Sequence, residues 1–136
     1  MRRGQGGMAV LELVLLAPLF VVLVYVVVGL GRLGLARQDV DAVARDAARA
    51  GSLARSAEEA AIAARAAATD ALGRHDLTCA ELDLDVETAS FGPGGWVRVE
   101  LACRVALDDL AGPWVRGSRV LSAAGQAAVD AYRGTR

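Results

Sequence analysis

An uncharged apolar stretch decides the fold: residues 13–31 read LVLLAPLFVVLVYVVVGLG. As an α-helix these 19 residues would span about 28 Å, at about 1.5 Å per residue. The hydrocarbon core of a bilayer is about 30 Å thick. From Arg32 on, the chain carries 13 of its 15 arginines and 15 of its 16 acidic residues. The sequence therefore predicts one membrane-spanning helix followed by a single water-facing part.

A removable secretory signal peptide is the alternative interpretation of this stretch. Arg2 and Arg3 would form its basic region, but the apolar segment is longer than the usual ~7–15 residues. The sequence that follows, GLGRLGLARQ, is also a poor cleavage site. The span is therefore predicted to stay in the protein. Charge does not decide its orientation, because Arg2 and Arg3 face Arg32 and Arg37 across it.

The composition limits both the core and the chemistry. The chain has 136 residues, of which 54% are hydrophobic but only 4% aromatic, and 28 are alanine, so one small domain with a core of small side chains is expected. The formal net charge of -1 argues against a nucleic-acid-binding protein, which needs a basic excess. All 15 basic residues are arginine, which excludes a phosphate-loop lysine and a Schiff-base lysine.

Two helices are predicted. The first continues beyond the span without a proline, over about residues 8–50, and Gly51 gives a stop signal. The second begins at Ser56, which forms a capping-box signature with Glu59, and it ends at Gly73, a typical C-terminal cap. Its apolar face is almost all alanine, so it can pack closely on a neighbour.

Two later segments alternate apolar and charged residues, which predicts half-buried strands. The apolar positions are Leu82, Leu84 and Val86 in the first segment, and Val97, Val99, Leu101, Cys103, Val105 and Leu107 in the second. The turn sequence SFGPGG at residues 90–95 indicates an antiparallel hairpin, with acidic residues of the first strand beside arginines of the second. With a third extended segment at residues 119–129, the predicted fold class is α+β. It comprises a single N-terminal transmembrane helix extended outward, an alanine-rich helix and a small three-stranded antiparallel sheet.

No motif supports catalysis, a cofactor or a metal. Gly29, Gly31 and Gly34 match GxGxxG, but they end a hydrophobic helix instead of following a strand, so close helix contact is favoured over nucleotide binding. His75, beside Asp76, has no second ligand or nucleophile in evident partnership and is interpreted as an exposed loop residue. No cluster of histidine, cysteine and carboxylate residues has metal-ligand spacing. We therefore expect no enzyme activity and no small-molecule substrate.

The only cysteines, Cys79 and Cys103, flank the predicted hairpin. In an oxidising compartment such a pair is expected to form a disulfide; two small buried core residues are the alternative. Cys103 shares the apolar face of its strand, whereas Cys79 is in phase with the acidic residue Glu81. For the bridge to form, Cys79 must precede the regular strand, or a bulge must intervene.

The N-terminus reads MRRGQGGMAVLELVLLAP. A basic, glycine-rich leader ends at Gly7, and a single carboxylate, Glu12, stands at the fifth position after it. A carboxylate in a membrane helix costs about 2.5 to 3.5 kcal/mol at mid-span and less near an end, so it indicates a function. The alternative is that Glu12 only lies in the headgroup zone, but its spacing from Gly7 is the type IV prepilin pattern.

The chain resembles the TadE-like family, the pilin-like (pseudopilin) proteins of tight-adherence (Tad/Flp) type IV pilus systems. The match is strongest over residues 7–51: the glycine and glutamate, Ala17–Pro18, the valine/leucine span and ARQDVDAVARDAARAG. The cysteine pair, FGPGGWVRVELAC and the terminal VDAYRG resemble actinobacterial members.

This resemblance implies cleavage by a membrane prepilin peptidase between Gly7 and Met8. The new amino group of Met8 would pair with the Glu12 carboxylate of an adjoining subunit during assembly. The leader would be cytoplasmic, and the C-terminal part would lie outside the cell membrane or in a surface pilus used for adhesion or secretion. The implied partners are the lipid bilayer, the peptidase, other Tad pilins and pilus assembly proteins. The implied segments are a leader at 1–7, a transmembrane helix at 8–33 and an extracytoplasmic pilin-like domain at 34–136.

Two other functions are weighed against the minor pilin or pseudopilin. The first is a single-span membrane protein that is never processed and displays a small extracytoplasmic binding domain. The second is a membrane-tethered enzyme, for which the sequence offers no catalytic residues. N-terminal sequencing of the membrane-extracted protein would distinguish the pilin hypothesis from the display-protein hypothesis.

Overall fold

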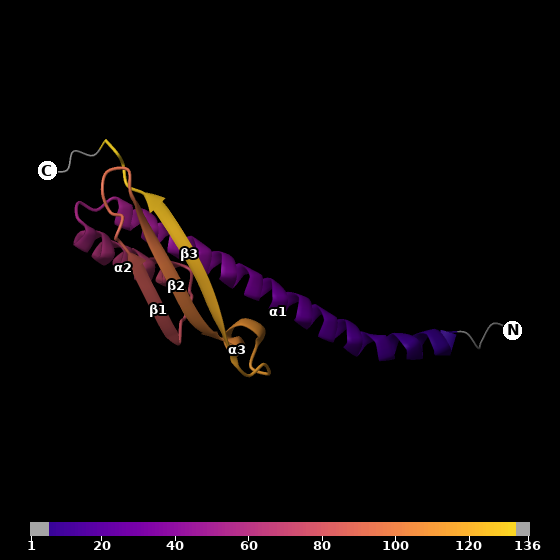
Figure 1. The fold of residues 1–136 in the computed structure, drawn as a ribbon. Helices are drawn as coiled ribbons and strands as arrows, with labels where there is room; N and C mark the ends of the chain where they lie inside the picture. The colour runs from indigo at the N-terminus through magenta and orange to yellow at the C-terminus, as the bar shows by residue number, and fades with distance from the viewer. Residues whose placement is uncertain (1–5, 133–136) are drawn as a thin grey trace.

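In a computed structural model of the chain, which describes residues 6–132, two helices cover one face of a three-stranded sheet (Figure 1). The elements, in order, are α1 (Gly6–Ser52), α2 (Ala57–Arg74), β1 (Glu81–Glu87), β2 (Trp96–Ala106), α3 (Leu107–Ala111) and β3 (Ser118–Ala128). The strand order is β1-β2-β3, and both pairs are antiparallel. The predicted α+β architecture is confirmed.

Helix α1 is continuous over 47 residues and divides into two parts. Its C-terminal part packs on the sheet and on α2, whereas its N-terminal part extends away from the rest of the fold (Figure 1). The N-terminal part contains Pro18 and bends (Figure 1). Proline has no N–H to donate to the preceding turn, and this is a common cause of a bend.

Alanine forms the contact face of α2. Its buried residues are Ala60, Ala64, Ala68, Ala71 and Leu72, a spacing of three to four residues that places them on one face of a helix. α1 ends at Ser52, directly after the predicted stop at Gly51. Gly51 also serves packing, because a Cβ there would stand 3.2 Å from the Ala60 carbonyl oxygen and 3.1 Å from Val97 Cγ1. The absence of side chains there lets α1, α2 and β2 meet closely.

The predicted start of α2 is confirmed, and its predicted end is wrong. Ser56 is the N-cap, and its Oγ accepts a hydrogen bond from the Glu59 N–H at 3.2 Å. At the other end Gly73 is still helical, and Asp76 has the positive φ of 51°. The N–H groups of Asp76 and Leu77 donate to the carbonyls of Gly73 and Leu72. This is a Schellman motif, in which Asp76 holds the position that glycine prefers.

We expect Asp76→Gly to raise the free energy of unfolding by about 0.5 to 1 kcal/mol, because glycine adopts a positive φ without a Cβ penalty. Urea denaturation in detergent micelles, followed by tryptophan fluorescence, measures the change. An unchanged or lower midpoint would contradict the role given to this residue.

The sheet follows the predicted alternation in β2, and in β1 at Leu84 and Val86, which are half-buried; Leu82, predicted on the same face, is 40% exposed. Val97, Val99, Leu101, Cys103 and Val105 of β2 are buried, and the residues between them are exposed or half-buried. Leu107 was expected to continue the strand, but it begins α3. Leu107 instead packs in a groove against α1, a contact that alternation along the chain cannot reveal.

The predicted placement of acidic residues beside arginines is confirmed at both ends of the hairpin, where Glu81 faces Arg104 and Glu87 faces Arg98. A cross-strand ion pair forms at the first of these. Arg104 Nε lies 3.1 Å from Glu81 Oε2, and these two residues are register partners. Arg98 instead pairs within its own strand, with Glu100 at 3.0 Å. Asp85 faces Glu100 in the register, and like charges directly opposite are unfavourable.

One glycine of β3 sets how closely the sheet approaches α1. Gly125 is buried, and a Cβ added to it would collide with the backbone carbonyl group of Ala44 and would stand 2.7 Å from the Arg45 nitrogen. Glycine inside a strand often marks such an approach of another backbone. The helix and the strand therefore touch backbone to backbone at this point.

Candidate functional site

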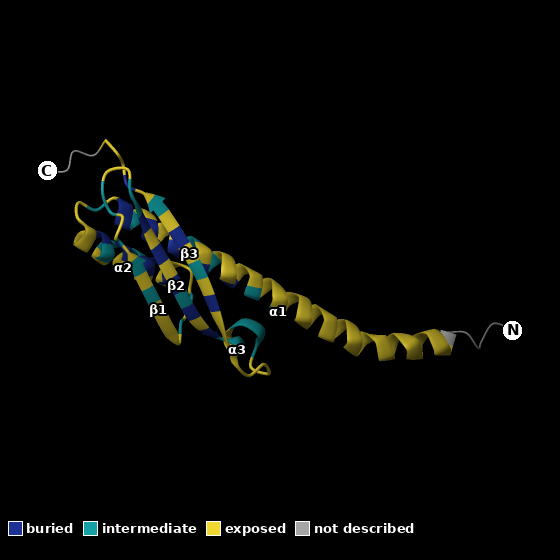
Figure 2. Cartoon of the chain, viewed as in Figure 1, coloured by how far each residue is buried: buried dark blue, intermediate teal, exposed yellow. Residues whose placement is uncertain are grey.

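Most apolar side chains on the N-terminal part of α1 are exposed (Figure 2), and near the end of this part Tyr25 and Val26 line a groove shared with α3. Large hydrophobic residues from Met8 to Val28 are 39% to 73% exposed, and the most apolar 18-residue window has a mean hydropathy of 3.0 with none of it buried. By length and composition this is one helix able to cross a membrane. An unpartnered apolar surface of this size in water would be very unfavourable.

Gly7, Met8 and Glu12 all lie on this uncovered part of α1. Gly7 has no neighbouring atom within 4 Å of an added Cβ, and Met8 is 73% exposed. Glu12 is the only charged residue between Met8 and Gly31. Met8 and Glu12 are four positions apart, so they lie on the same face of α1, about one turn apart. Residues 1–5 of the predicted leader 1–7 lie outside the described residues.

The three glycines of the GxGxxG motif differ in their surroundings. A Cβ on Gly29 would lie 3.6 Å from the Ala111 Cβ of α3, an ordinary van der Waals distance, so Gly29 faces α3. Gly31 and Gly34 have no atom within 4 Å of an added Cβ. These two remain open to a neighbouring helix.

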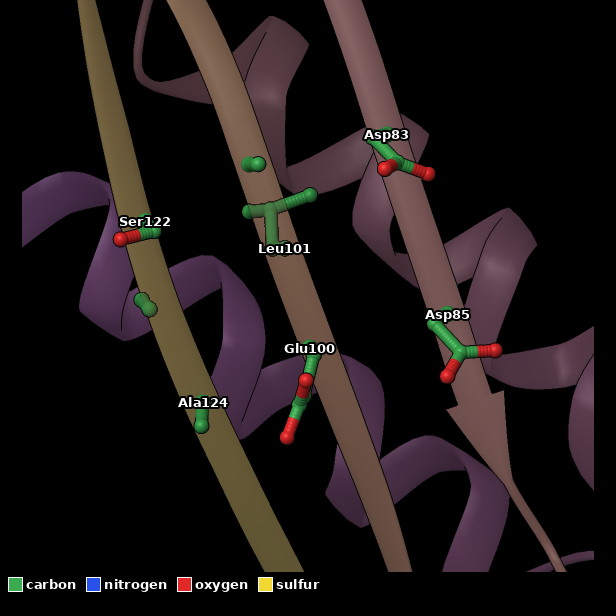
Figure 3. A pocket seen from close by; sticks show the side chains of 8 residues that line it. Asp83, Asp85, Glu100, Leu101, Ser122 and Ala124 are labelled. Carbon is green, nitrogen blue, oxygen red and sulfur yellow. The ribbon is translucent and has the colours of Figure 1, made fainter.

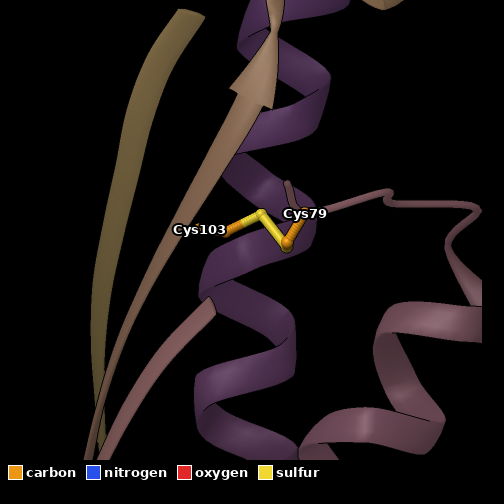
Figure 4. Close-up of a disulfide and its surroundings, with 2 residues drawn as sticks. All are labelled: Cys79 and Cys103. Atoms are coloured by element: carbon orange, nitrogen blue, oxygen red, sulfur yellow. A yellow bond between two sulfur atoms is a disulfide. The ribbon is translucent and has the colours of Figure 1, made fainter. Parts of the chain in front are cut away.

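The structure joins Cys79 and Cys103 by a disulfide with a Cα–Cα distance of 5.3 Å (Figure 4). Cys103 faces the core from β2, and Cys79 precedes β1, in which Glu81 is the first residue. Of the two ways to reconcile the phase of Cys79 with the bridge, the structure therefore shows the first. The Ala80 N–H donates to the Arg104 carbonyl at 2.8 Å, which holds this segment beside β2.

Loss of this disulfide should lower the free energy of unfolding by about 3 kcal/mol, because the bridge restricts a loop of about 25 residues in the unfolded chain. Urea denaturation of Cys79→Ala/Cys103→Ala measures the loss, and wild-type protein under reducing conditions is the control.

Alkylation of protein from its native envelope should find no free thiol without reductant. Two alkylated cysteines in that experiment would rule the bridge out.

His75 has a partner that the sequence interpretation missed. It is the C-cap of α2, and its Nδ1 lies 3.1 Å from Oδ1 of Asp39 on α1. Both side chains are about one-third exposed. The contact joins the two helices and involves no nucleophile, so it is adequately explained as a structural one.

The outer face of the sheet carries an acidic hollow of about 360 Å³ (Figure 3). Asp83 and Asp85 of β1 and Glu100 of β2 stand around it, with small residues of β3 on the other side. Within residues 6–132 no group of three or more histidine, cysteine or acidic residues is placed to hold a metal ion.

A second apolar feature, also missed by the sequence interpretation, lies where α3 meets α1. A groove of about 330 Å³ separates them. Its lining residues are Tyr25, Val26, Gly29, Leu30 and Leu33 of α1 and Leu107, Leu110, Ala111, Trp114 and Val115. Asp108 and Asp109 form the exposed polar side of α3.

Comparison with known proteins identifies the N-terminal third of the chain. No curated protein and no solved structure matches the sequence. Residues 7–49, which include Gly7, Glu12 and the whole apolar span, match the family described as TadE-like protein. The expected resemblance to the TadE-like family is therefore confirmed over this segment, which is about one third of the chain.

Proposed function

We propose that this chain is a minor pilin or pseudopilin of a Tad-type pilus system, without enzymatic activity. A prepilin peptidase cleaves it between Gly7 and Met8, and the mature subunit acts in assembling a surface appendage for adhesion or secretion. The observation that carries the proposal is the N-terminal part of α1. It is apolar, unpartnered and charged only at Glu12, and it belongs to the segment that matches the family.

The uncovered helix suits both steps of this function. A peptidase working at the membrane needs free access to its scissile bond, and nothing within residues 6–132 covers Gly7 or Met8. A helix that joins a filament needs an apolar face that the subunit itself leaves unpaired. The carboxylate of Glu12 would be tolerated in such an assembly when a neighbour's amino group neutralises it.

The proposed orientation places residues 1–7 in the cytoplasm, the helix at 8–33 in the membrane and residues 34–136 outside. The disulfide supports this arrangement, because disulfides persist in oxidising compartments outside the cytoplasm. The alternative is an unprocessed single-span protein that displays its sheet as a binding domain. It has the same orientation but keeps its leader.

N-terminal sequencing of the membrane-extracted protein tests processing directly. We expect the wild-type protein to begin at Met8 and Gly7→Leu to remain longer and unprocessed, because the peptidase requires a position without a side chain. Gly34→Leu is a matched control: it makes the same change on the same helix, also at a position with open surroundings, and it should be processed normally. Wild-type protein that begins before Met8 would favour the display protein.

A further inference from the structure

The segment after β2 forms a closed loop at the end of the globular part that faces the apolar half of α1 (Figure 1). We call residues 107–117 the α3 loop. Its ends are joined by a hydrogen bond from the Leu107 N–H to the Gly117 carbonyl, 2.9 Å long. Within it, Gly112 and Val115 donate backbone hydrogen bonds to Asp108 and Gly112. A loop with internal hydrogen bonds and adjacent ends is a compact unit of the Ω-loop type.

The α3 loop has one apolar side and one polar side. Leu107, Leu110 and Ala111 turn toward α1 and line the groove, and Asp108 and Asp109 are exposed away from it. Trp114 also lines the groove but is 80% exposed. A tryptophan exposed to this extent beside an apolar groove is unfavourable in water and is typical of the membrane–water interface.

The position of the groove along α1 determines how deep the groove would lie in the membrane. The uncharged stretch ends at Gly31, and the groove extends back to Tyr25, six residues earlier. Six residues of helix correspond to about 9 Å. Amphipathic segments that lie in the interface are buried by about 5 to 10 Å. The apolar side of the α3 loop is therefore level with the outermost turns of the span. Arg32 and Arg116 are the charged residues next in sequence to its lining residues.

We propose that the α3 loop is a second membrane contact, in which Trp114 inserts into the interface and lipid acyl chains fill the groove between α3 and α1. The inference rests on the membrane insertion of α1 in the proposed function. Lipid is the occupant because the groove is continuous with the surface of α1 that faces the bilayer. The contact would hold the sheet at a fixed distance and orientation from the membrane surface.

Tryptophan fluorescence tests the inference, because the chain has only two tryptophans and they lie at opposite ends of the β2–α3 unit. Trp96 begins β2, and Trp114 follows its other end, so the eleven residues of β2 separate them by about 30 Å. Full-length Trp96→Phe reports on Trp114, and Trp114→Phe is the matched control that reports on Trp96. Each is reconstituted in phosphatidylcholine vesicles with a minority of phosphatidylglycerol, and flotation with the vesicles confirms insertion.

In vesicles whose lipids carry bromine near the start of the acyl chain, Trp114 should lose more than half of its emission and Trp96 almost none. Aqueous iodide should give the opposite ranking. Wild-type protein, with both tryptophans, should show the same brominated-lipid quenching as a partial loss, so the result does not depend on the folding of either variant.

Two outcomes would overturn the proposal while leaving the insertion of α1 intact. In the first, the floated protein has a Trp114 that iodide quenches as strongly as Trp96 and that brominated lipid does not quench. In the second, Trp114 is protected from both quenchers, which would show that a second copy of the chain, not lipid, covers the groove. Protein that fails to float would instead contradict the membrane anchoring in the proposed function.

Discussion

Gly125→Ala should lower the free energy of unfolding by about 3 kcal/mol or more, the upper range for overpacking a core. The added methyl group would collide with the backbone carbonyl group of Ala44, and a backbone cannot rotate away as a flexible side chain can. α1 and β3 would have to separate, and the small side chains around them could not fill the gap. Urea denaturation in micelles gives the loss, and a clearly reduced amount of folded protein would accompany it.

Gly73→Ala is the matched control. It adds the same methyl group, but it should change the free energy of unfolding in the opposite direction. Gly73 lies inside α2, and no atom lies within 4 Å of an added Cβ. Alanine is favoured over glycine in a helix by about 0.5 to 1 kcal/mol, so this variant should be slightly more stable than wild type. If both variants shifted stability equally, the close contact at Gly125 would not be the cause.

Glu12→Gln should leave insertion and cleavage intact and abolish most assembly. A neutral amide is easier to bury than a carboxylate, so the protein should be abundant in the membrane and cut after Gly7. Docking would leave the neighbour's Met8 amino group unpaired in lipid, at a cost of about 3 to 5 kcal/mol if the pair is fully buried. That cost reduces the docking equilibrium by two or more powers of ten, at about 1.4 kcal/mol for each.

Crosslinking to other pilins and the amount of surface pili measure this loss. Glu12→Asp is the matched control, because it keeps the charge and shortens the side chain by one methylene group; it should assemble better than Glu12→Gln. Normal crosslinking and normal pili from Glu12→Gln would mean that Glu12 only lies at the headgroup boundary.

Local patterns predicted the parts of the fold that depend on nearby residues. The charge-free span, the Ser56–Glu59 cap and the alternation of β2 each depend on residues that are close in the sequence, and all three are present in the structure. The phase of Cys79 relative to Glu81 also indicated that the bridge would need either Cys79 outside the regular strand or a bulge in it, and the structure has the first.

The features that sequence did not predict depend on contacts between distant segments. Leu107 continues the alternation of β2, but its groove contact with α1 involves residues more than seventy positions away. The partner of His75 is Asp39, on another helix. Gly125 has no signature in its local sequence, because the need for glycine there arises only from the close approach of the Ala44 backbone. The roles proposed for Gly7 and Glu12 involve a peptidase and a neighbouring subunit, which the folded chain does not contain.

The unbroken course of α1 has a mechanical consequence. From Pro18 to Ser52 the helix runs about 50 Å. Its far end is held against the sheet by the close contact between the backbones of Ala44 and Gly125. In the proposed orientation Pro18 lies inside the bilayer and Ser52 outside it. A change of about 10° in the bend at Pro18 would then displace the Ser52 end by about 9 Å, so a small tilt within the membrane would become a large displacement at the outer surface.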